Sequence, residues 1–143
     1  MANDLMLKTA NRVHRALVKL TGGRVGWHAS NMPVLQLTTI GRKSGQPRTV
    51  MLTSPYQKDD TMVIVASKGG DDHHPAWFLN LRDNSDVEVT TKGQSKRKMT
   101  ARIATPDERA ELWPLIAEAH ANYAGYQTKT DREIPLVLLS PSP

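Results

Sequence analysis

The sequence predicts a mainly β fold in which a small antiparallel barrel of about six strands carries about three helices. Three observations predict it: six short segments have strand-like composition, three segments have helical character, and tight turns join most of them. Short strands separated by tight turns are typical of a sheet that curls into a small barrel.

The first element is an amphipathic helix over residues 4–20, within an N-terminal unit of residues 1–24. Asn3 or Asp4 can cap its start and Gly22-Gly23 can end it. Its four cations are Lys8, Arg12, Arg15 and Lys19. Such a helix either packs on the domain or contacts anionic lipid at the inner face of the cell membrane.

The predicted strands lie within residues 33–140, which we expect to form a single domain together with the first helix. In order they are Val34–Ile40, Pro47–Ser54, Thr61–Ser67, Val87–Thr91, Arg97–Ala104 and Ile134–Leu139. Two pairs of them are predicted to form hairpins, one around the turn Gly41–Gly45 and the other around Lys92–Gln94.

Two further helices interrupt the strands. Residues 75–82 predict a short helix, because Pro75 suits a first helical turn. The run Thr105-Pro106-Asp107-Glu108 predicts a helix start with a capping box, and this helix runs to about Ala121. We expect residues 122–133 to form a polar loop that carries aromatic side chains.

Composition limits the function classes. The 143 residues suffice for one domain that buries roughly two-thirds of its unfolded surface. The chain has no cysteine, which excludes disulfides and zinc–thiolate sites. No apolar run reaches the ~20 residues of a membrane span and no signal segment opens the chain. We therefore expect a cytoplasmic protein.

The charge balance favours an anionic partner. Nineteen Lys and Arg residues against fourteen Asp and Glu residues give a net charge of +5. Nucleic acid, a membrane surface and a phosphorylated small molecule would all suit this charge, as would a basic surface without a ligand. The chain has one Phe, so an array of exposed aromatic side chains for stacking bases is not expected. We expect no nucleic-acid partner.

The turn Gly41–Gly45 has the composition of an anion site. Its two glycines let backbone N–H groups approach a ligand, while Arg42, Lys43, Ser44 and the following Arg48 supply charge and donors. Taken alone, the same pattern is also typical of a solvated turn. Neither a Gly-x4-Gly-Lys-Ser/Thr phosphate loop nor a Gly-x-Gly-x-x-Gly fingerprint is present.

The run Thr39–Arg48 (TIGRKSGQPR) resembles the signature turn of the deazaflavin (coenzyme F-420)-dependent nitroreductase family. Further segments match that family in order, namely Ala66–Gly70, Pro75–Leu81 and Tyr123–Tyr126, which leads to Thr130–Arg132 and Ile134-Pro135. The resemblance covers about residues 33–139. It implies a split β-barrel of the flavin-reductase type and an oxidoreductase that uses reduced coenzyme F-420 as hydride donor.

The resemblance also implies which residues bind the coenzyme, a long polyanion with a flat apolar head. They are Gln36, Thr38, Arg42, Lys43, Ser44, Gly45, Gln46, Pro47, Arg48, Ala66, Ser67, Lys68, Gly69, Ala76, Trp77 and Asn80. By residue type alone, Trp77 is more typical of a buried core position. Asn80 is a better candidate ligand, because an amide within an apolar turn requires a hydrogen-bond partner.

The catalytic residues implied by the resemblance are Ser67, Tyr123 and Tyr126. Ser67 would donate a hydrogen bond to the acceptor, and the two tyrosines would form an aromatic wall. The chain departs from the family pattern at Thr53 and His120, where other members can carry aromatic side chains, and we place both in the substrate site. A quinone, a nitroaromatic or nitroimidazole compound, or an enone could be the acceptor, and we favour a quinone.

Two alternatives share the same barrel. One is a non-catalytic carrier of the deazaflavin or of a lipid-like ligand, and the other is an oxidoreductase that uses FMN. The oligomeric state is left open. We expect no metal, because His73-His74 and Asp71-Asp72 are adjacent residues that seldom converge on one ion.

Overall fold

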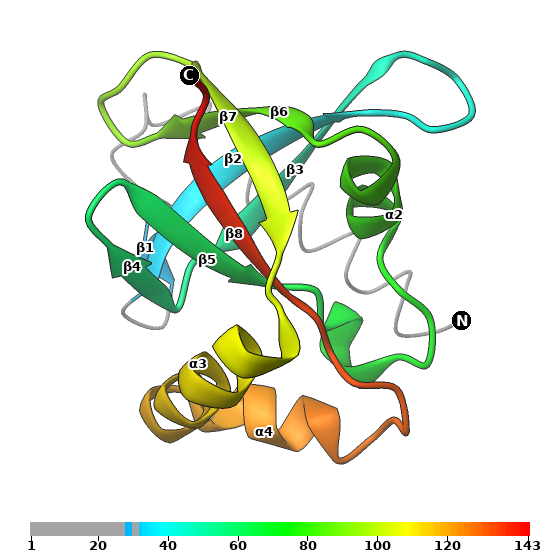
Figure 1. The fold of residues 1–143 in the computed structure, drawn as a ribbon, viewed down its shortest axis with the longest axis vertical. Coiled ribbons are helices and arrows are strands. Elements are labelled where there is room, and N and C mark those ends of the chain that lie inside the picture. Colours follow the sequence, from blue (N-terminus) through cyan, green and yellow to red (C-terminus); the bar gives the residue numbers. More distant parts are fainter. Residues whose placement is uncertain (1–27, 30–31) are drawn as a thin grey trace.

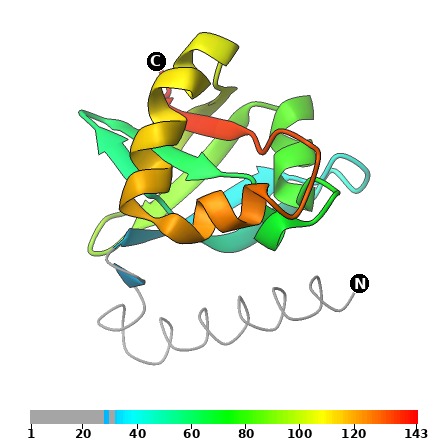
Figure 2. The ribbon, with the colours of Figure 1, turned by 90° about the horizontal axis from the view of Figure 1, so that it is seen from below.

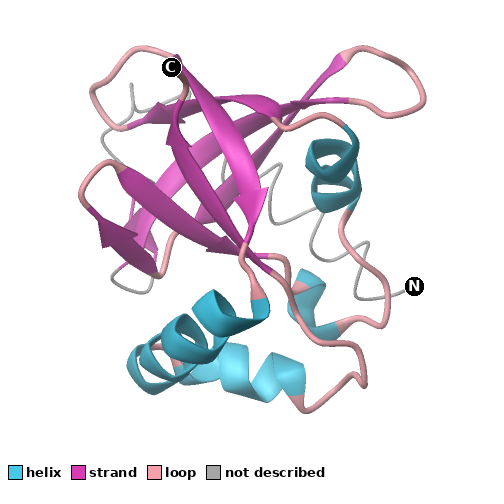
Figure 3. Cartoon of the chain, viewed as in Figure 1, coloured by secondary structure: helices cyan, strands magenta, loops and turns pink. Residues whose placement is uncertain are grey.

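In the computed structural model, residues 28–29 and 32–143 are described, and they form a curled antiparallel sheet with helices along one end and one side (Figure 1). The predicted helix over residues 4–20 and the unit 1–24 lie outside the described residues. The strands are β1 (His28–Ala29), β2 (Met32–Ile40), β3 (Pro47–Thr53), β4 (Tyr56–Lys58), β5 (Thr61–Val65), β6 (Asp86–Thr91), β7 (Arg97–Ile103) and β8 (Leu136–Pro141). The predicted mainly β barrel with helical additions is confirmed (Figure 3).

The sheet has the order β1-β2-β6-β7-β8-β5-β4, and β3 also pairs with β2. Both predicted hairpins are confirmed: Ile40 lies opposite Pro47 in the first, and Val89 lies opposite Arg97 in the second. The sequence patterns missed β1 and β4, because two or three residues are too few to show an alternating pattern.

Four helical segments accompany the sheet: η1 (Lys68–Gly70), α2 (Ala76–Asp83), α3 (Pro106–Ala119) and α4 (Ala121–Gln127). The two predicted helices after the first hairpin are confirmed as α2 and α3. The capping box is present, since Glu108 N donates to Thr105 Oγ1 at 3.2 Å and Thr105 N donates to Glu108 Oε1 at 2.9 Å.

The prediction of a loop over residues 122–133 is wrong for its first part, which forms α4. Asn122 and Gly125 give this segment weak helix propensity. Tyr123 is only 5% exposed and packs with Ile116 of α3 and Val65 of β5, so burial of its ring stabilises the helix.

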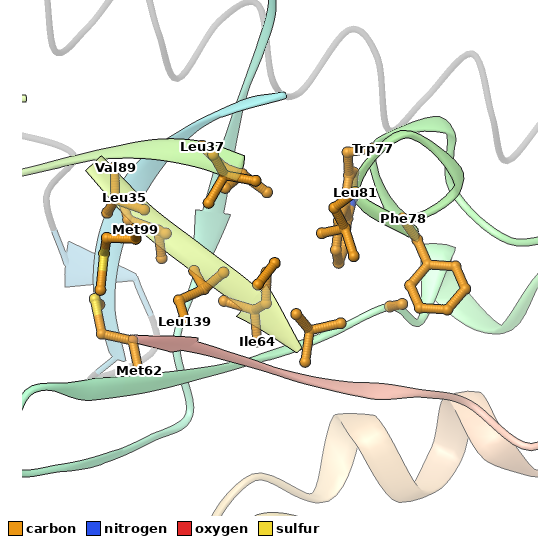
Figure 4. Close-up of a cluster of buried hydrophobic side chains, with 14 residues drawn as sticks. Leu35, Leu37, Met62, Ile64, Trp77, Phe78, Leu81, Val89, Met99 and Leu139 are labelled. Atoms are coloured by element: carbon orange, nitrogen blue, oxygen red, sulfur yellow. The ribbon is translucent and has the colours of Figure 1, made fainter. Parts of the chain in front are cut away.

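Two hydrophobic clusters flank the sheet. The first fills the barrel and contains Leu37, Ile64 and Leu139, with Trp77 and Leu81 of α2 packed at its end (Figure 4). The second includes Val63, Val65 and Ile116 and joins the other face of β5 to α3 and α4. Figure 2 shows these two helices lying across that side of the sheet. Both faces of β5 are therefore buried, which explains why its sequence is apolar without alternation.

None of the helices within the described part of the chain has the length and apolar composition that crossing a bilayer requires.

Candidate functional site

A cleft of about 500 Å³ opens between the β2–β3 turn and the N-terminal half of α2. In Figure 1 this turn extends beside α2 at the upper right of the molecule. The lining residues come from these two elements and from the adjoining strand ends; they are Thr39, Gly41, Arg42, Lys43, Ser44, Pro47, Arg48, Thr49, Val50, Ala76, Trp77 and Asn80. Eight of the predicted coenzyme residues are thus brought to one cleft.

The electrostatic character of the cleft is uniform. Arg42, Lys43 and Arg48 are exposed, and no Asp or Glu lies among the lining residues. Ala76 and Trp77 supply apolar surface at the helix side. The arrangement suits a ligand with an anionic part and an apolar part.

The glycines of the turn have specific structural roles. Gly41 N donates to Gln46 O at 2.8 Å, and Gly45 N donates to Gly41 O at 2.8 Å. A Cβ at Gly41 would lie 2.5 Å from Ser44 Oγ, and Gly45 has a φ of 71°. Ser44 Oγ in turn accepts from Arg48 Nη2 at 3.3 Å. The turn is therefore closed by internal bonds that hold its cations at the cleft.

Asn80 joins the turn to α2. Its Oδ1 accepts the backbone N–H of Arg42 at 3.2 Å and the Nη1 of Arg42 at 3.0 Å, while its Nδ2 donates to Thr39 Oγ1 at 3.2 Å. The side chain is buried, with 4% of Asn80 exposed. The hydrogen-bond partners that this buried amide requires are therefore supplied by Arg42 and Thr39 of the protein itself.

Other predicted coenzyme residues lie outside the cleft. Gln36 and Thr38 are in β2, on the face opposite to Thr39, and the Thr38 hydroxyl lies 2.8 Å from that of Thr49. Gly45 and Gln46 complete the turn without lining the cleft.

The segment Ala66–Asp71 precedes α2 in the chain and contains η1. Three successive residues have positive φ: Lys68 at 47°, Gly69 at 65° and Gly70 at 87°. Ala66 is fully buried and Ser67 is 9% exposed. The predicted coenzyme residues Ala66, Ser67, Lys68 and Gly69 do not line the cleft beside the turn and form a second group.

Four of the five residues predicted for the acceptor site, namely Thr53, His120, Tyr123 and Tyr126, are brought together around α4. Tyr123 packs edge-to-face with His120, at 6.3 Å between ring centroids, and with Tyr126, at 6.0 Å. The Tyr123 hydroxyl lies 3.2 Å from Thr53 Oγ1 and donates to Met32 Sδ at 3.6 Å. Burial raises the pKa of Tyr123, and the hydrogen bond with Thr53 opposes this shift. Tyr123 is thus a neutral phenol held by β3.

The acceptor group also touches the segment that carries Ser67. A Cβ at Gly70 would lie only 2.7 Å from the backbone oxygen of Tyr126. Because Gly70 has no side chain, α4 approaches this segment closely. The structure thereby places Ser67 and the tyrosine helix in one neighbourhood.

The histidine pair has structural contacts. Asp71 Oδ1 accepts from the backbone N–H of His73 at 2.8 Å, and the His74 ring packs against Phe78 at 4.7 Å. Burial, followed by the charges of Arg132 and Arg82, lowers the pKa of His74. Within residues 28–29 and 32–143, no group of three His, Asp or Glu side chains could hold a metal ion.

Sequence reasoning assigned no role to Arg132, although it lies in one of the matching segments. Its guanidinium donates to backbone oxygens of Ala66, Ser67 and Asp71. A single arginine between Asp131 and Glu133 carries no sequence signal of such a role, because its partners are more than sixty residues away.

Comparisons with known proteins agree on one family. The family model described as F420H(2)-dependent quinone reductase matches residues 10–141. The chain is similar to an F420H(2)-dependent quinone reductase of Mycobacterium tuberculosis, with 42% identity over 134 residues, covering 90% of this chain and 88% of that protein.

Two solved structures are also similar to this chain. One is a structure of an F420-H2 dependent reductase, FDR-A, with 40% identity and a TM-score of 0.66, covering 76% of this chain and 94% of that one. The other is described as a domain-swapped dimer and has 37% identity and a TM-score of 0.69, covering 90% of this chain and 96% of that one.

Proposed function

The chain belongs to the F420H(2)-dependent quinone reductase family, and on this premise we propose that it transfers a hydride from reduced coenzyme F-420 to a quinone. The observation that carries the proposal is the cleft between the β2–β3 turn and α2. It combines three cations, no lining carboxylate and the apolar surface of Ala76 and Trp77.

The residues of the cleft fit this coenzyme. A polyanionic phosphate and glutamate tail requires cations and fixed donors, which Arg42, Lys43 and Arg48 supply. The hydrogen bonds that Arg42 donates to Asn80 and Arg48 donates to Ser44 hold two of these side chains in place before a ligand arrives. Preorganised cations bind an anion at a smaller entropic cost than mobile ones.

Bound reduced coenzyme F-420 supplies a hydride from carbon 5 of its ring. The chain's own residues position the partners and support the negative charge that the acceptor gains. We assign the donor role to the Ser67 hydroxyl and the wall of the acceptor site to Tyr123 and Tyr126. Tyr123 is the more rigid of the two tyrosines, since Thr53 and Met32 hold its hydroxyl.

We propose a quinone as the acceptor class. Thr53 and His120 lie at positions where other members of the family can carry aromatic side chains. The Thr53 hydroxyl is hydrogen-bonded to the Tyr123 hydroxyl. The relatives' names support a quinone as acceptor. Nitroimidazoles and enones belong to the proposal as secondary acceptors that the same wall could accommodate.

A membrane contact belongs to the same proposal. Residues 4–20 carry four cations beside apolar positions, and a lipid-soluble quinone is reached most directly at a membrane surface. Sedimentation with vesicles of anionic or zwitterionic lipid tests this contact. Binding to anionic vesicles that is lost with residues 1–24 removed supports it, and equal sedimentation with and without these residues contradicts it.

The decisive experiment mixes the protein with reduced coenzyme F-420 and a panel of quinones, enones and nitroimidazoles, and follows reoxidation by absorbance. Turnover with a quinone supports the proposal. Coenzyme binding without reoxidation by any acceptor indicates a carrier, and yellow protein that retains FMN and oxidises NAD(P)H indicates the FMN alternative.

A matched pair of variants links the activity to the cleft. Arg48→Gln removes a lining cation, whereas Lys58→Gln removes an exposed cation from β4, outside the cleft. We expect Arg48→Gln to weaken coenzyme binding about tenfold, as loss of a charge-assisted hydrogen bond does, and Lys58→Gln to leave it unchanged. Equal effects of the two variants would contradict the assignment of the cleft.

A further inference from the structure

Arg132 donates hydrogen bonds to both ends of Ala66–Asp71, the segment that carries Ser67. Arg132 lies between α4 and β8, and its Nε donates to Asp71 O at 2.8 Å. Its Nη1 donates to Ala66 O at 3.2 Å, and its Nη2 donates to Ser67 O at 2.8 Å. All three nitrogens of one guanidinium thus hold carbonyls of a single segment.

The segment has a conformation that needs such support. Lys68, Gly69 and Gly70 all have positive φ, and Lys68 does so with a side chain, at 47°. Left-handed backbone disfavours a residue with a Cβ. Ser67 O also accepts from Gly70 N at 3.0 Å, so Arg132 and Gly70 converge on the same carbonyl.

Arg132 is itself tied to the end of α4. Its backbone N–H donates to Thr130 Oγ1 at 3.3 Å, and its carbonyl accepts from Gln127 Nε2 at 2.7 Å. Gly70 meets the backbone of Tyr126 on the same side. The segment of Ser67 and the tyrosine helix are therefore joined twice, once through Arg132 and once through the contact at Gly70.

The shape of guanidinium matters for this role. A planar fork presents donors in three directions, and three carbonyls here receive one donor each. A lysine ammonium is a compact charge that keeps the sign but cannot reach all three. Arg132 is half-buried, and the nearby charges of Asp71 and Asp72 oppose the lowering of its pKa by burial.

We propose that Arg132 is a positioning residue that fixes Ala66–Asp71 against α4, so that the Ser67 hydroxyl and the tyrosine wall face the same bound ligands. It contacts backbone oxygens of the segment and acts through them. The inference rests on the proposed function for the identity of those ligands.

The test compares Arg132→Lys with Arg109→Lys. Arg109 is a second half-buried arginine in the same region, and it donates instead to Ile134 O at 3.0 Å and Gln127 Oε1 at 3.1 Å. Each variant loses hydrogen bonds of a planar guanidinium and keeps the positive charge. If a loss of stability were the only effect, the two variants would show similar changes in hydrogen exchange and in coenzyme binding. Thermal unfolding of both variants measures how much stability each one loses.

Two readouts are used. Amide hydrogen exchange of residues 66–74 in the absence of coenzyme reports the conformation of the segment. Calorimetric titration with coenzyme F-420, together with kcat and KM for a quinone, reports how the conformation of the segment affects coenzyme binding and turnover. We expect Arg132→Lys to accelerate exchange and to weaken coenzyme binding about tenfold or more, the size typical of losing a charged hydrogen bond.

We expect Arg109→Lys to change both readouts by a smaller factor than Arg132→Lys does, because Arg109 is linked to Arg132 only through Gln127 and donates to none of the carbonyls of the segment. Equal changes in the two variants, or no change with Arg132→Lys, would overturn the positioning role while leaving the proposed function intact. Wild-type protein that binds no coenzyme F-420 would instead overturn the proposed function and, with it, this inference.

Discussion

Asn80 holds Arg42 by two hydrogen bonds to one oxygen: its Oδ1 accepts the backbone N–H of Arg42 at 3.2 Å and the Nη1 of Arg42 at 3.0 Å. The two residues come from different elements, since Arg42 follows β2 and Asn80 lies in α2. Their link makes the cationic turn and the helix one rigid wall of the cleft.

Asn80→Ala should therefore weaken both the fold and the cleft. Loss of the buried amide leaves the Arg42 N–H without this partner, which we expect to cost about 2 kcal/mol of unfolding free energy. Coenzyme F-420 affinity should fall about tenfold, because the guanidinium of Arg42 loses its fixed position. Urea unfolding and calorimetric titration measure the two effects.

Asn84→Ala is the matched control, since Asn84 is exposed at the end of α2 and its Oδ1 accepts only the local N–H of Asp86 at 3.1 Å. It should leave coenzyme affinity unchanged. If both variants bind the coenzyme as well as the wild type does, Asn80 does not position Arg42.

Gly70→Ala tests the close contact between the Ser67 segment and α4. A Cβ at Gly70 combines a φ of +87° with a distance of 2.7 Å to Tyr126 O, whereas a Cβ at Gly93 has a φ of +72° and nothing within 4 Å. We expect Gly93→Ala to cost about 1 kcal/mol, from backbone conformation alone. Gly70→Ala should cost about 2 to 4 kcal/mol, because overpacking adds to it. Equal urea midpoints for the two variants would contradict the contact.

The parts of the fold that local chemistry determines could be predicted from the sequence. The two hairpins follow from turn residues between strand patterns, and the start of α3 follows from the capping box. The helix α4 could not be predicted, because its stability comes from burying Tyr123 rather than from the propensity of Asn122 or Gly125.

The candidate site shows the same division. The cations of the turn are recognisable by residue type and spacing, whereas the tyrosines were implied by the family resemblance. The partners of Asn80 and Arg132 are not recognisable in this way, because these contacts join residues 38 and 61 to 66 positions apart and depend on how α2 and the loop before β8 dock on the sheet.

Acid stability should depend on Glu108. The Arg102 guanidinium, and then the backbone N–H of Thr105, lower the pKa of Glu108 to about 2 from an ordinary value of 4.5. A carboxylate with a lowered pKa in the folded state contributes stability above the unfolded value, and this contribution is lost as the pH falls through the folded value.

Glu108→Gln should therefore reduce stability near neutral pH and flatten the loss between about pH 4.5 and pH 2. The difference should not exceed about 1 kcal/mol, because the pair is exposed to solvent. Urea midpoints of wild type and variant at several pH values in this window measure it. Parallel curves would show that Glu108 does not carry this part of the acid sensitivity.

Removing the hydrogen bond between Thr53 and Tyr123 should change both the pKa of Tyr123 and turnover. Thr53 Oγ1 lies 3.2 Å from the Tyr123 hydroxyl, and this contact opposes the rise that burial causes in the pKa of Tyr123. Thr53→Val keeps the side-chain shape and removes the bond, so the pKa of Tyr123 should rise further, as its absorbance titration would show. Unfolding free energy should fall by about 1 kcal/mol. Because the ring is then less firmly oriented, kcat for a quinone should fall more than coenzyme affinity does.

Thr61→Val is the control. It removes a contact of 3.0 Å between the hydroxyls of Thr61 and Ser140, which join β5 and β8 and do not involve α4. Should Thr53→Val and Thr61→Val leave kcat equally unchanged, the orientation of Tyr123 does not limit turnover.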